Sequence, residues 1–381
     1  MAKKSKTVSK ITRSTSRKAP KSDGGGLDLA LLTRLCETPG VPGREERVRA
    51  VIEKEIKGLF DTTEVDALGS LICRRQPRDA SGKKKTVKNP KTVMMLCHMD
   101  EIGFYVTHIC DKGYVYIDAA GGFDTRNLFS RRVTVCTDSG DLPGVMNPGG
   151  RPVHIASQED RKKVPEVKEF MVDLGMNAEE AKKRVKVGDY IVMNEPAMKM
   201  GDKFVSKALD NRVACWLGID SVRELAKLKL AHNCELVVAF TTQEEVGLRG
   251  ARTASFAVRP DIGIGIDVTL ACDTPGVPES EAVSVHGKGF ALHLKDGSFI
   301  SDRELTMQVE KLAKKKRIPY QRSILGAGGQ DGAAAQQAAA GAKAVGITVG
   351  TRYIHTVTEM IDKGDLQAAC DILALVMADA K

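Results

Sequence analysis

Histidine and carboxylate side chains follow four short apolar segments of this chain. These side chains are His98, the adjacent pair Glu244 and Glu245, Asp267, and His355. Continuous apolar segments are typical of parallel strands that are covered on both faces, and ligands bind at the carboxyl edge of such sheets. A single histidine after a strand is usually a hydrogen-bonded loop residue. Four such positions in succession instead indicate one shared site at this edge.

Asp210 is a fifth candidate, within the segment 208–212. It directly precedes a predicted helix, where an aspartate usually serves as the N-cap. The alternative is a carboxylate shared by two divalent metal ions, which lie ~3.5–4 Å apart in such sites and need a bridging ligand. The other ligands then divide into two pairs, namely His98 with Asp267 and Glu245 with His355. Two imidazoles and three carboxylates without a thiolate suit zinc, cobalt or manganese.

The adjacent acids Glu244 and Glu245 can divide two tasks. Glu245 can bind metal, while Glu244 faces a water whose pKa the metal lowers. Glu244 can then accept the proton of this water and pass it to a leaving amine. Asp100 lies two residues after His98, on the same side of an extended chain, and can orient the imidazole ring. The simpler alternative for the acidic pair is a loop exposed to solvent.

The elements that must position these residues follow an α/β pattern. Apolar periodicity predicts helices at residues 27–37, 44–59, 211–228, 303–316 and 365–380, and strands at 68–74, 235–241, 262–268 and 344–349. Between residues 104 and 198 the chain shows only short strand-like segments, separated by turns, and one helix at 178–184. We therefore expect a mixed, largely parallel sheet flanked by helices, with an inserted, mainly β domain. The expected boundaries are 27–103 and 199–381 for the catalytic domain and 104–198 for the insert.

The positive net charge of +9 belongs almost entirely to the N-terminus. The first 25 residues contain eight Lys or Arg and one Asp, and they lack the apolar content that would offset the entropy of ordering. We expect residues 1–26 to be a disordered basic tail that increases solubility. A tether to nucleic acid or another acidic surface, or an organelle transit peptide, remains an alternative.

The apolar segments and the cysteines indicate a cellular compartment. No apolar stretch reaches the 18 residues that a membrane-spanning helix needs, and the N-terminus lacks the apolar region of a secretory signal. The nine cysteines form no CxxC pair, so we expect them to be reduced and mostly buried. Together these features predict a cytoplasmic protein without a membrane anchor.

Several motifs of the chain resemble one known family, the tetrahedral or glutamyl aminopeptidases, whose members have often been labelled endoglucanases. The matching segments are 37–45, 98–104, 208–212, 242–251, 328–332 and 352–356, together with 154–175 of the insert. The resemblance covers residues 27–380. It implies a fold of the zinc-exopeptidase type and a zinc or cobalt enzyme that removes N-terminal residues from peptides. It also implies a homo-oligomer assembled through the insert, typically a hollow tetrahedral dodecamer.

The resemblance also assigns roles to individual residues. The family's metal ligands correspond to His98, Asp210, Glu245, Asp267 and His355, and its general base corresponds to Glu244. The chain departs from the family at Gln330, where a threonine is usual, and at residues 356–359, which read Thr-Val-Thr-Glu in place of Ser-Pro-Ser-Glu. Neither departure removes a ligand, but both can alter the shape of the substrate pocket.

Three other functions must be weighed against the aminopeptidase. A carboxypeptidase or deacylase on the same scaffold needs a group that binds a substrate carboxylate, for which Arg249, Arg252 and Arg352 are candidates. A glycosidase needs two carboxylates ~5–9.5 Å apart across the sugar bond and usually aromatic platforms, whereas this chain has one Trp. A non-enzymatic binding protein with a basic arm would not need the complete ligand set. The sequence favours a metal-dependent aminopeptidase.

Overall fold

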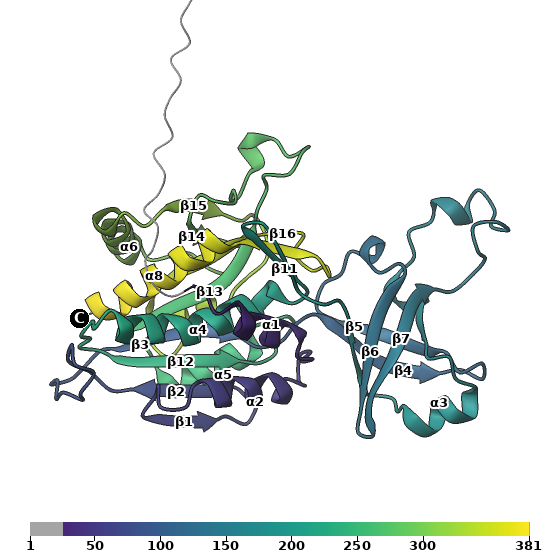
Figure 1. The fold of residues 1–381 in the computed structure, drawn as a ribbon, viewed down its shortest axis with the longest axis horizontal. Coiled ribbons are helices and arrows are strands. Elements are labelled where there is room, and N and C mark those ends of the chain that lie inside the picture. Colours follow the sequence, from purple (N-terminus) through teal and green to yellow (C-terminus); the bar gives the residue numbers. More distant parts are fainter. Residues whose placement is uncertain (1–25, 381) are drawn as a thin grey trace, which may run out of the picture.

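The computed structural model describes residues 26–380, which form a large mixed sheet with a smaller closed barrel beside it (Figure 1). The predicted basic tail covers residues 1–26 and therefore lies, apart from Gly26, outside the described residues, as does Lys381. Within residues 26–380, no helix combines the length and the hydropathy that a membrane crossing requires.

The four central strands of the large sheet run parallel. In spatial order they are β12 (Glu235–Thr241), β3 (Thr92–His98), β13 (Ile262–Leu270) and β16 (Lys343–Arg352). They contain the four apolar segments of the sequence, so their carboxyl ends meet at one edge. Outside them the sheet continues through antiparallel pairs, except that β14 (Phe290–Lys295) and β15 (Tyr320–Ile324) pair in parallel. The prediction of a mixed sheet with parallel strands is confirmed, and these strands form its centre.

The remaining strands of this sheet flank the parallel centre. On one side lie β2 (Leu71–Arg75) and β1 (Thr62–Val65). On the other side lie β17 (Glu359–Asp362), β11 (Lys203–Ser206) and β10 (Met198–Met200), while β14 and β15 form a branch beside β16.

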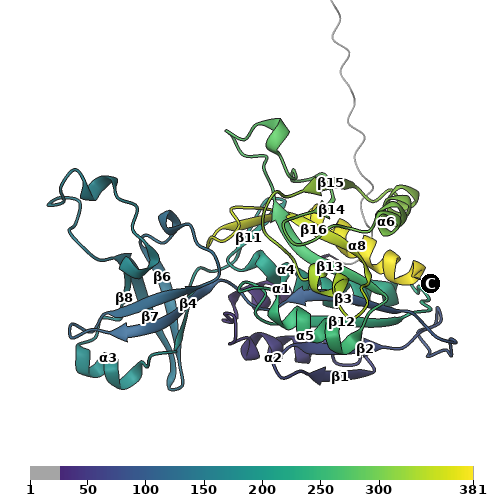
Figure 2. The ribbon, with the colours of Figure 1, turned by 180° about the vertical axis from the view of Figure 1, so that it is seen from behind.

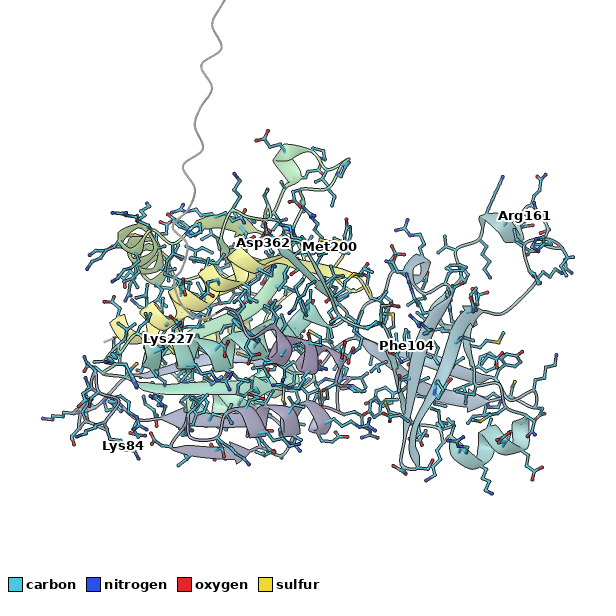
Figure 3. The ribbon with its side chains drawn as sticks, viewed as in Figure 1. Lys84, Phe104, Arg161, Met200, Lys227 and Asp362 are labelled. Atoms are coloured by element: carbon cyan, nitrogen blue, oxygen red, sulfur yellow. The ribbon has the colours of Figure 1, made fainter. Side chains whose placement is uncertain are left out.

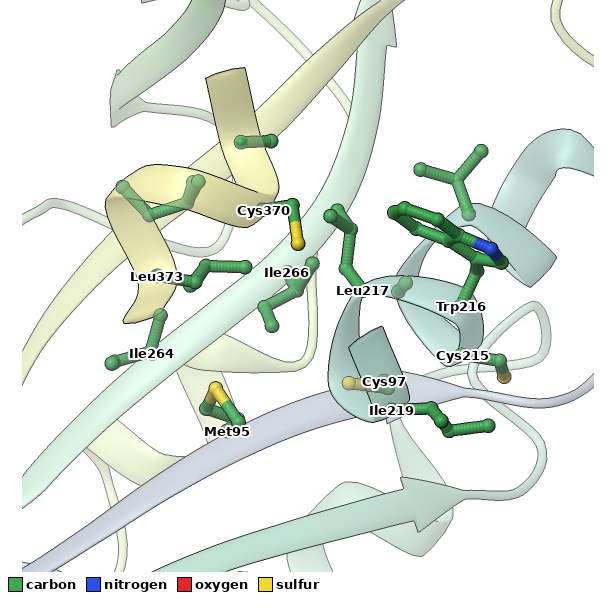
Figure 4. Packing of buried hydrophobic residues seen from close by; sticks show 14 of the residues in the cluster. Met95, Cys97, Cys215, Trp216, Leu217, Ile219, Ile264, Ile266, Cys370 and Leu373 are labelled. Atoms are coloured by element: carbon green, nitrogen blue, oxygen red, sulfur yellow. The ribbon is translucent and has the colours of Figure 1, made fainter. Parts of the chain in front are cut away.

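Helices cover both faces of the sheet, which explains why its central strands are apolar at successive positions. Val93, Met95 and Cys97 of β3 pack in one core with helices α1, α4 and α8, whereas Met94 and Leu96 pack in a second core with α5 and α7. Figure 4 shows part of the first core, where side chains of β3 and β13 meet those of α4 and α8. The helices are α1 (Leu29–Glu37), α2 (Glu46–Glu55), α4 (Leu209–Lys227), α5 (Arg249–Val258), α6 (Arg303–Lys316), α7 (Gly332–Gln336) and α8 (Lys363–Asp379).

Six strands between residues 103 and 193 close into a barrel with its own apolar core. They are β4 (Gly103–Ile109), β5 (Val115–Ala120), β6 (Arg131–Thr137), β7 (Gly140–Pro148), β8 (Phe170–Asp173) and β9 (Tyr190–Met193), with the short helix α3 (Ala178–Arg184) packed against them. Short 3-10 helices lie at Thr125–Asn127, Asp160–Lys162, Val167–Glu169 and Glu279–Glu281. The prediction of an inserted, mainly β unit is therefore confirmed, while its boundaries at residues 104 and 198 stay a prediction.

The barrel lies beside one end of the large sheet in both views (Figures 1 and 2). The chain passes from the end of β3 at His98 to the barrel strand β4 at Gly103, so this end is the carboxyl edge of the parallel strands. Figure 3 shows Phe104 where the barrel meets the sheet and Arg161 on a loop that projects from the barrel. The barrel is thus placed next to the edge where the sequence predicts the site.

Gly250 allows helix α5 to contact the end of β12. A Cβ atom at this position would lie 2.5 Å from the backbone N and O atoms of Thr242 and 2.6 Å from Ser70 Oγ. We expect Gly250→Ala to lower the free energy of unfolding by about 2 kcal/mol or more, because the helix must move away from the strand. Urea unfolding followed by circular dichroism measures this change. The control is Gly326→Ala, where nothing lies within 4 Å of the added atom; equal stability of the two variants would contradict the prediction.

Candidate metal centre

Six of the predicted site residues line a single cavity of about 730 Å³ at the carboxyl edge of the parallel strands. They are His98, Asp210, Glu244, Glu245, Asp267 and His355. His98 is the last residue of β3, Asp267 lies near the end of β13, and the other four lie on loops or at the start of a helix. The fold therefore brings together residues that are up to 257 positions apart, from 98 to 355.

Asp210 lies between the two histidines, with one carboxylate oxygen toward each. Its Oδ1 atom is 3.3 Å from Nε2 of His98, and its Oδ2 atom is 3.4 Å from Nε2 of His355. Nε2 of His355 is also 3.5 Å from Oε2 of Glu245. A carboxylate in this position can share its two oxygens between two ions, and the ring nitrogens face the same space.

The interpretation of Asp210 as a helix cap is wrong. The side chain that caps α4 belongs to Asn211, whose Oδ1 accepts a hydrogen bond from the backbone N–H of Ala214 at 3.0 Å. The Nδ2 group of Asn211 donates to Oδ1 of Asp267 at 2.9 Å. The neighbouring asparagine thus both begins the helix and orients a candidate ligand, and the Asp210 carboxylate is left to face the cavity.

Two overlapping groups of donor atoms could each hold a metal ion. The first contains His98, Asp210 and Glu245, and the second contains His98, Glu244 and Asp267; within each group the donor atoms lie within 4.8 Å of one another. The sequence predicts that Glu244 is the base. It nevertheless belongs to the second group, because its Oε2 atom is 3.9 Å from Nε2 of His98. The predicted division of the ligands into two pairs stays a prediction.

The charges of the cavity fit divalent cations. Burial, together with neighbouring acids, raises the pKa of Glu244, Glu245 and Asp267 above their ordinary values. Burial alone would lower the pKa of His355, but its contacts with Asp210 and Glu245 outweigh burial and raise it to about 12. The pKa of His98 is raised in the same way by Glu244 and other carboxylates. So many buried carboxylates are costly without positive charge beside them, and two divalent ions would supply that charge.

Asp100 contacts His98 and also holds the turn that carries the adjacent acids. The Nδ1 atom of His98 is 3.2 Å from the backbone oxygen of Asp100 and 3.5 Å from its Oδ1 atom. The carboxylate of Asp100 accepts hydrogen bonds from the backbone N–H groups of Glu244 at 3.1 Å and Glu245 at 3.0 Å. The structure thus places Asp100 beside the imidazole, and its role in orienting the ring stays a prediction. The contact with the turn is one that the sequence did not indicate.

Glu359 is a buried residue of the site that sequence reasoning missed. Its Oε2 atom accepts a hydrogen bond from the N–H of Asp210 at 3.0 Å, and its Oε1 atom accepts one from the N–H of His355 at 2.8 Å. One carboxylate thereby fixes the backbone of two candidate ligands. The signal in the sequence was that Glu359, four residues after His355, is the one position of 356–359 that matches the family pattern Ser-Pro-Ser-Glu.

The barrel unit contributes Gly122 to the lining of the cavity. A Cβ atom at Gly121 would lie 2.4 Å from Cγ2 of Ile102 and 3.4 Å from Oε2 of Glu245. Gly121 also has a φ of +98°, which most residues with side chains avoid. Glycine at 121 therefore lets the backbone pass Ile102 and approach Glu245. At Gly122 a Cβ atom would lie 3.6 Å from Nδ1 of His355, an ordinary contact distance. The sequence did not predict that the insert approaches two candidate ligands.

The three arginines considered for binding a substrate carboxylate lie in different surroundings. Arg352 makes two hydrogen bonds of 2.6 Å to Asp273, and Arg249 contacts the side chain of Gln243 at 3.4 Å. Arg252 is exposed and lines the cavity. Of these arginines, Arg252 is the one placed to meet a molecule in the cavity.

Comparison with known proteins identifies the family. The sequence model of the M42 glutamyl aminopeptidases matches residues 80–372. A protein of Acetivibrio thermocellus is 37% identical over 345 residues, which cover 90% of this chain and 96% of that protein. The structure of the aminopeptidase APDkam598 from Desulfurococcus kamchatkensis is 31% identical, with a TM-score of 0.84 over 92% of this chain and 94% of that chain.

A further solved structure adds information about assembly. The TET1 peptidase of Pyrococcus horikoshii, which can assemble into a tetrahedron or a large octahedral shell, is 30% identical, with a TM-score of 0.79 over 92% of this chain and 99% of that chain. The resemblance seen in the sequence motifs is confirmed by these matches. The chain belongs to the M42 glutamyl aminopeptidase family.

Proposed function

We propose that this protein is a metal-dependent aminopeptidase that hydrolyses N-terminal residues from peptides with two divalent ions. The proposal rests on one observation: imidazoles and carboxylates from five separate segments converge on one cavity, with Asp210 between the two histidines. The ligands are His98, Asp210, Glu245, Asp267 and His355. Their donor atoms suit zinc or cobalt, and also manganese.

The residues of the cavity have distinct tasks in this reaction. Two bound ions would polarise the scissile carbonyl and lower the pKa of a water molecule. Asp210 holds its two oxygens toward the two histidines, which fixes the spacing of the two halves of the ligand set. Asn211 and Glu359 hold Asp267, Asp210 and His355 in place through hydrogen bonds.

Glu244 acts as the general base and then as the general acid. Its carboxylate lines the cavity, and Asp100 fixes its backbone. The Oε2 atom of Glu244 lies 3.9 Å from Nε2 of the ligand His98, so this side chain is placed to take a proton from the attacking water and to deliver it to the leaving amine. Glu245, the next residue, faces His355 and serves as a ligand.

A carboxypeptidase or deacylase is the second candidate, and one observation favours it. Arg252 is exposed in the same cavity, where its guanidinium could bind a carboxylate of the substrate. The two functions differ in the end of the peptide that they require. An aminopeptidase needs a free amino terminus, whereas a carboxypeptidase needs a free carboxyl terminus and a deacylase acts on the acylated amine.

We also propose that the protein assembles into a homo-oligomer through the barrel, as a tetrahedral dodecamer. The TET1 peptidase of Pyrococcus horikoshii supports this proposal. Further support comes from the loop between β7 and β8, on which Val153, Ile155 and Val164 expose more than half of their surface. Exposed apolar side chains grouped in this way mark protein–protein contacts. All nine cysteines are free, which fits the reducing cytoplasm that we propose for this enzyme.

Metal removal tests the proposed function. We expect dialysis against a chelator to abolish hydrolysis of a leucyl peptide, and addition of zinc or cobalt to restore it, because the bound ions would polarise the scissile carbonyl and lower the pKa of the attacking water. Three forms of the same peptide are compared: one with both ends free, one with an acetylated N-terminus, and one with an amidated C-terminus. Cleavage of the free and amidated forms alone identifies an aminopeptidase. Cleavage of the acetylated form, or turnover that is unaffected by the chelator, would contradict the proposal.

A further inference from the structure

We infer that Glu45 is a positioning residue for the turn that carries Glu244, an inference that rests on the proposed role of Glu244 as the general base. This turn presents three consecutive backbone N–H groups to two buried carboxylates. Those of Glu244 and Glu245 donate to Asp100. The first, that of Gln243, donates to Oε1 of Glu45 at 2.9 Å. Glu45 therefore completes the support of the turn from a segment 198 residues away in the sequence.

The turn needs such support because its backbone is strained. Gln243 has a φ of +57°, a conformation that is costly for a residue with a side chain and persists where the surroundings impose it. Within the turn, the N–H groups of Gly247 and Leu248 both donate to the carbonyl of Glu244. These bonds close the turn on itself but do not attach it to the rest of the protein. Asp100 attaches it to the segment after β3, and Glu45 attaches it to the segment before α2.

Glu45 is itself held rigidly. Its side chain is 3% exposed, and the oxygen that binds Gln243 also accepts a hydrogen bond from the N–H of Gly43 at 2.8 Å. A buried carboxylate without a cation is expensive unless its hydrogen bonds are satisfied. The two N–H groups meet this requirement for one oxygen, so the side chain has a fixed position from which to act on the turn.

Residues 41–47, which include Glu45, contact the barrel. Val41 packs in a small cluster with Cys136, Tyr190 and Val192 of the barrel. Pro42 and Arg47 are also fastened to the barrel. The hydroxyl of Tyr105 donates to the carbonyl of Pro42 at 2.6 Å, and Arg47 makes two hydrogen bonds, of 2.8 and 2.9 Å, to Asp141. The contacts with the barrel therefore fix the position of Glu45, and Glu45 in turn fixes the backbone of Gln243.

A small displacement of this turn would act on the chemical step. Proton transfer requires the carboxylate of Glu244 within hydrogen-bond reach of the reacting water, and a misplacement of ~1 Å can cost about 100-fold in rate. Glu45 contacts the N–H of Gln243, one residue before Glu244. Loss of this contact should therefore lower kcat, while KM and the metal content change little.

Shortening the side chain tests the inference. Glu45→Asp keeps the carboxyl group but removes one methylene, so the oxygen no longer reaches Gln243. We expect kcat for a leucyl peptide to fall about 10- to 100-fold, with KM and zinc content within about two-fold of the wild type. Glu45→Gln keeps an acceptor oxygen and should retain at least half of the wild-type kcat. Glu46→Ala, an exposed acid on the next residue, is the matched control and should behave as the wild type.

The outcomes separate this inference from the proposed function. A kcat of Glu45→Asp within two-fold of the wild type, or an equal loss in Glu45→Gln, would overturn the positioning role. A fall in zinc content that accounts for the loss of turnover would also overturn it. Circular dichroism checks folding, and Glu45→Ala is the second variant should the Asp form not fold. If the wild type itself shows no metal-dependent turnover, the proposed function fails instead.

Discussion

Replacing Glu244 by Gln should lower kcat by about 1,000-fold while the protein keeps its full metal content. The amide has the shape of the carboxylate but cannot accept the proton of the attacking water, a role that contributes roughly 10²- to 10⁴-fold in such reactions. A loss of about 1,000-fold corresponds to about 4 kcal/mol of activation free energy. The fold of the turn should persist, because Asp100 binds its backbone N–H groups and not its side chain.

Turnover of an aminoacyl chromogenic substrate and elemental analysis of the same sample measure this effect. Glu279→Gln, in an exposed acidic loop, is the control with the same chemical change. The experiment also separates the two groups of donor atoms, because Glu244 belongs to the one that includes Asp267. A variant that loses metal together with activity would make Glu244 a ligand. An active variant would show that another residue is the base.

Replacing Asp210 by Ala should remove both metal ions and all measurable turnover. Each oxygen of this carboxylate faces one histidine, at 3.3 and 3.4 Å, so its loss affects both halves of the ligand set. The backbone N–H of Asp210 still binds Glu359 in the variant, and Asn211 still caps helix α4. We therefore expect the secondary structure to be unchanged.

Elemental analysis after dialysis, together with calorimetric titration of zinc, measures the expected loss. Asp202→Ala, which changes an exposed aspartate outside the cavity, controls for the general effect of removing an acid. Full occupancy of two zinc ions per chain in the Asp210 variant would show that this residue is not the bridge. Loss of one ion alone would assign Asp210 to a single site.

The parallel centre of the sheet could be predicted from the sequence because its segments are almost continuously apolar. Their burial on two faces leaves a continuous apolar pattern that few other structures share. Strand β7 (Gly140–Pro148) gave no such signal, since it contains two glycines, two prolines, an aspartate and an asparagine, all of low strand propensity, and is largely exposed. It forms because β6 and β8 pair with it on either side. Tertiary pairing, and not local preference, decides its structure.

The candidate ligands could be named from the sequence because each follows a recognisable strand or begins a helix. Of the residues that support them, Asp100 could also be named, whereas Glu359, Glu45 and Asn211 could not. Glu359 and Glu45 accept hydrogen bonds from backbone N–H groups that are 149 and 198 residues away. Almost any residue can supply a backbone N–H group, so the residue type of the donor does not reveal such a bond. The contact of Asn211 with Asp267 was missed for a different reason. Asparagine is common at the start of a helix as a cap, so its residue type indicated no second role.

Gly121 and Gly122 bring the inserted unit beside two candidate ligands, Glu245 and His355. Gly122 also lines the cavity. Removing the insert would therefore take away one side of this cavity and leave both side chains more open to bulk water. The inserted unit is thus part of the enclosure of the cavity, and not only a separately folded barrel.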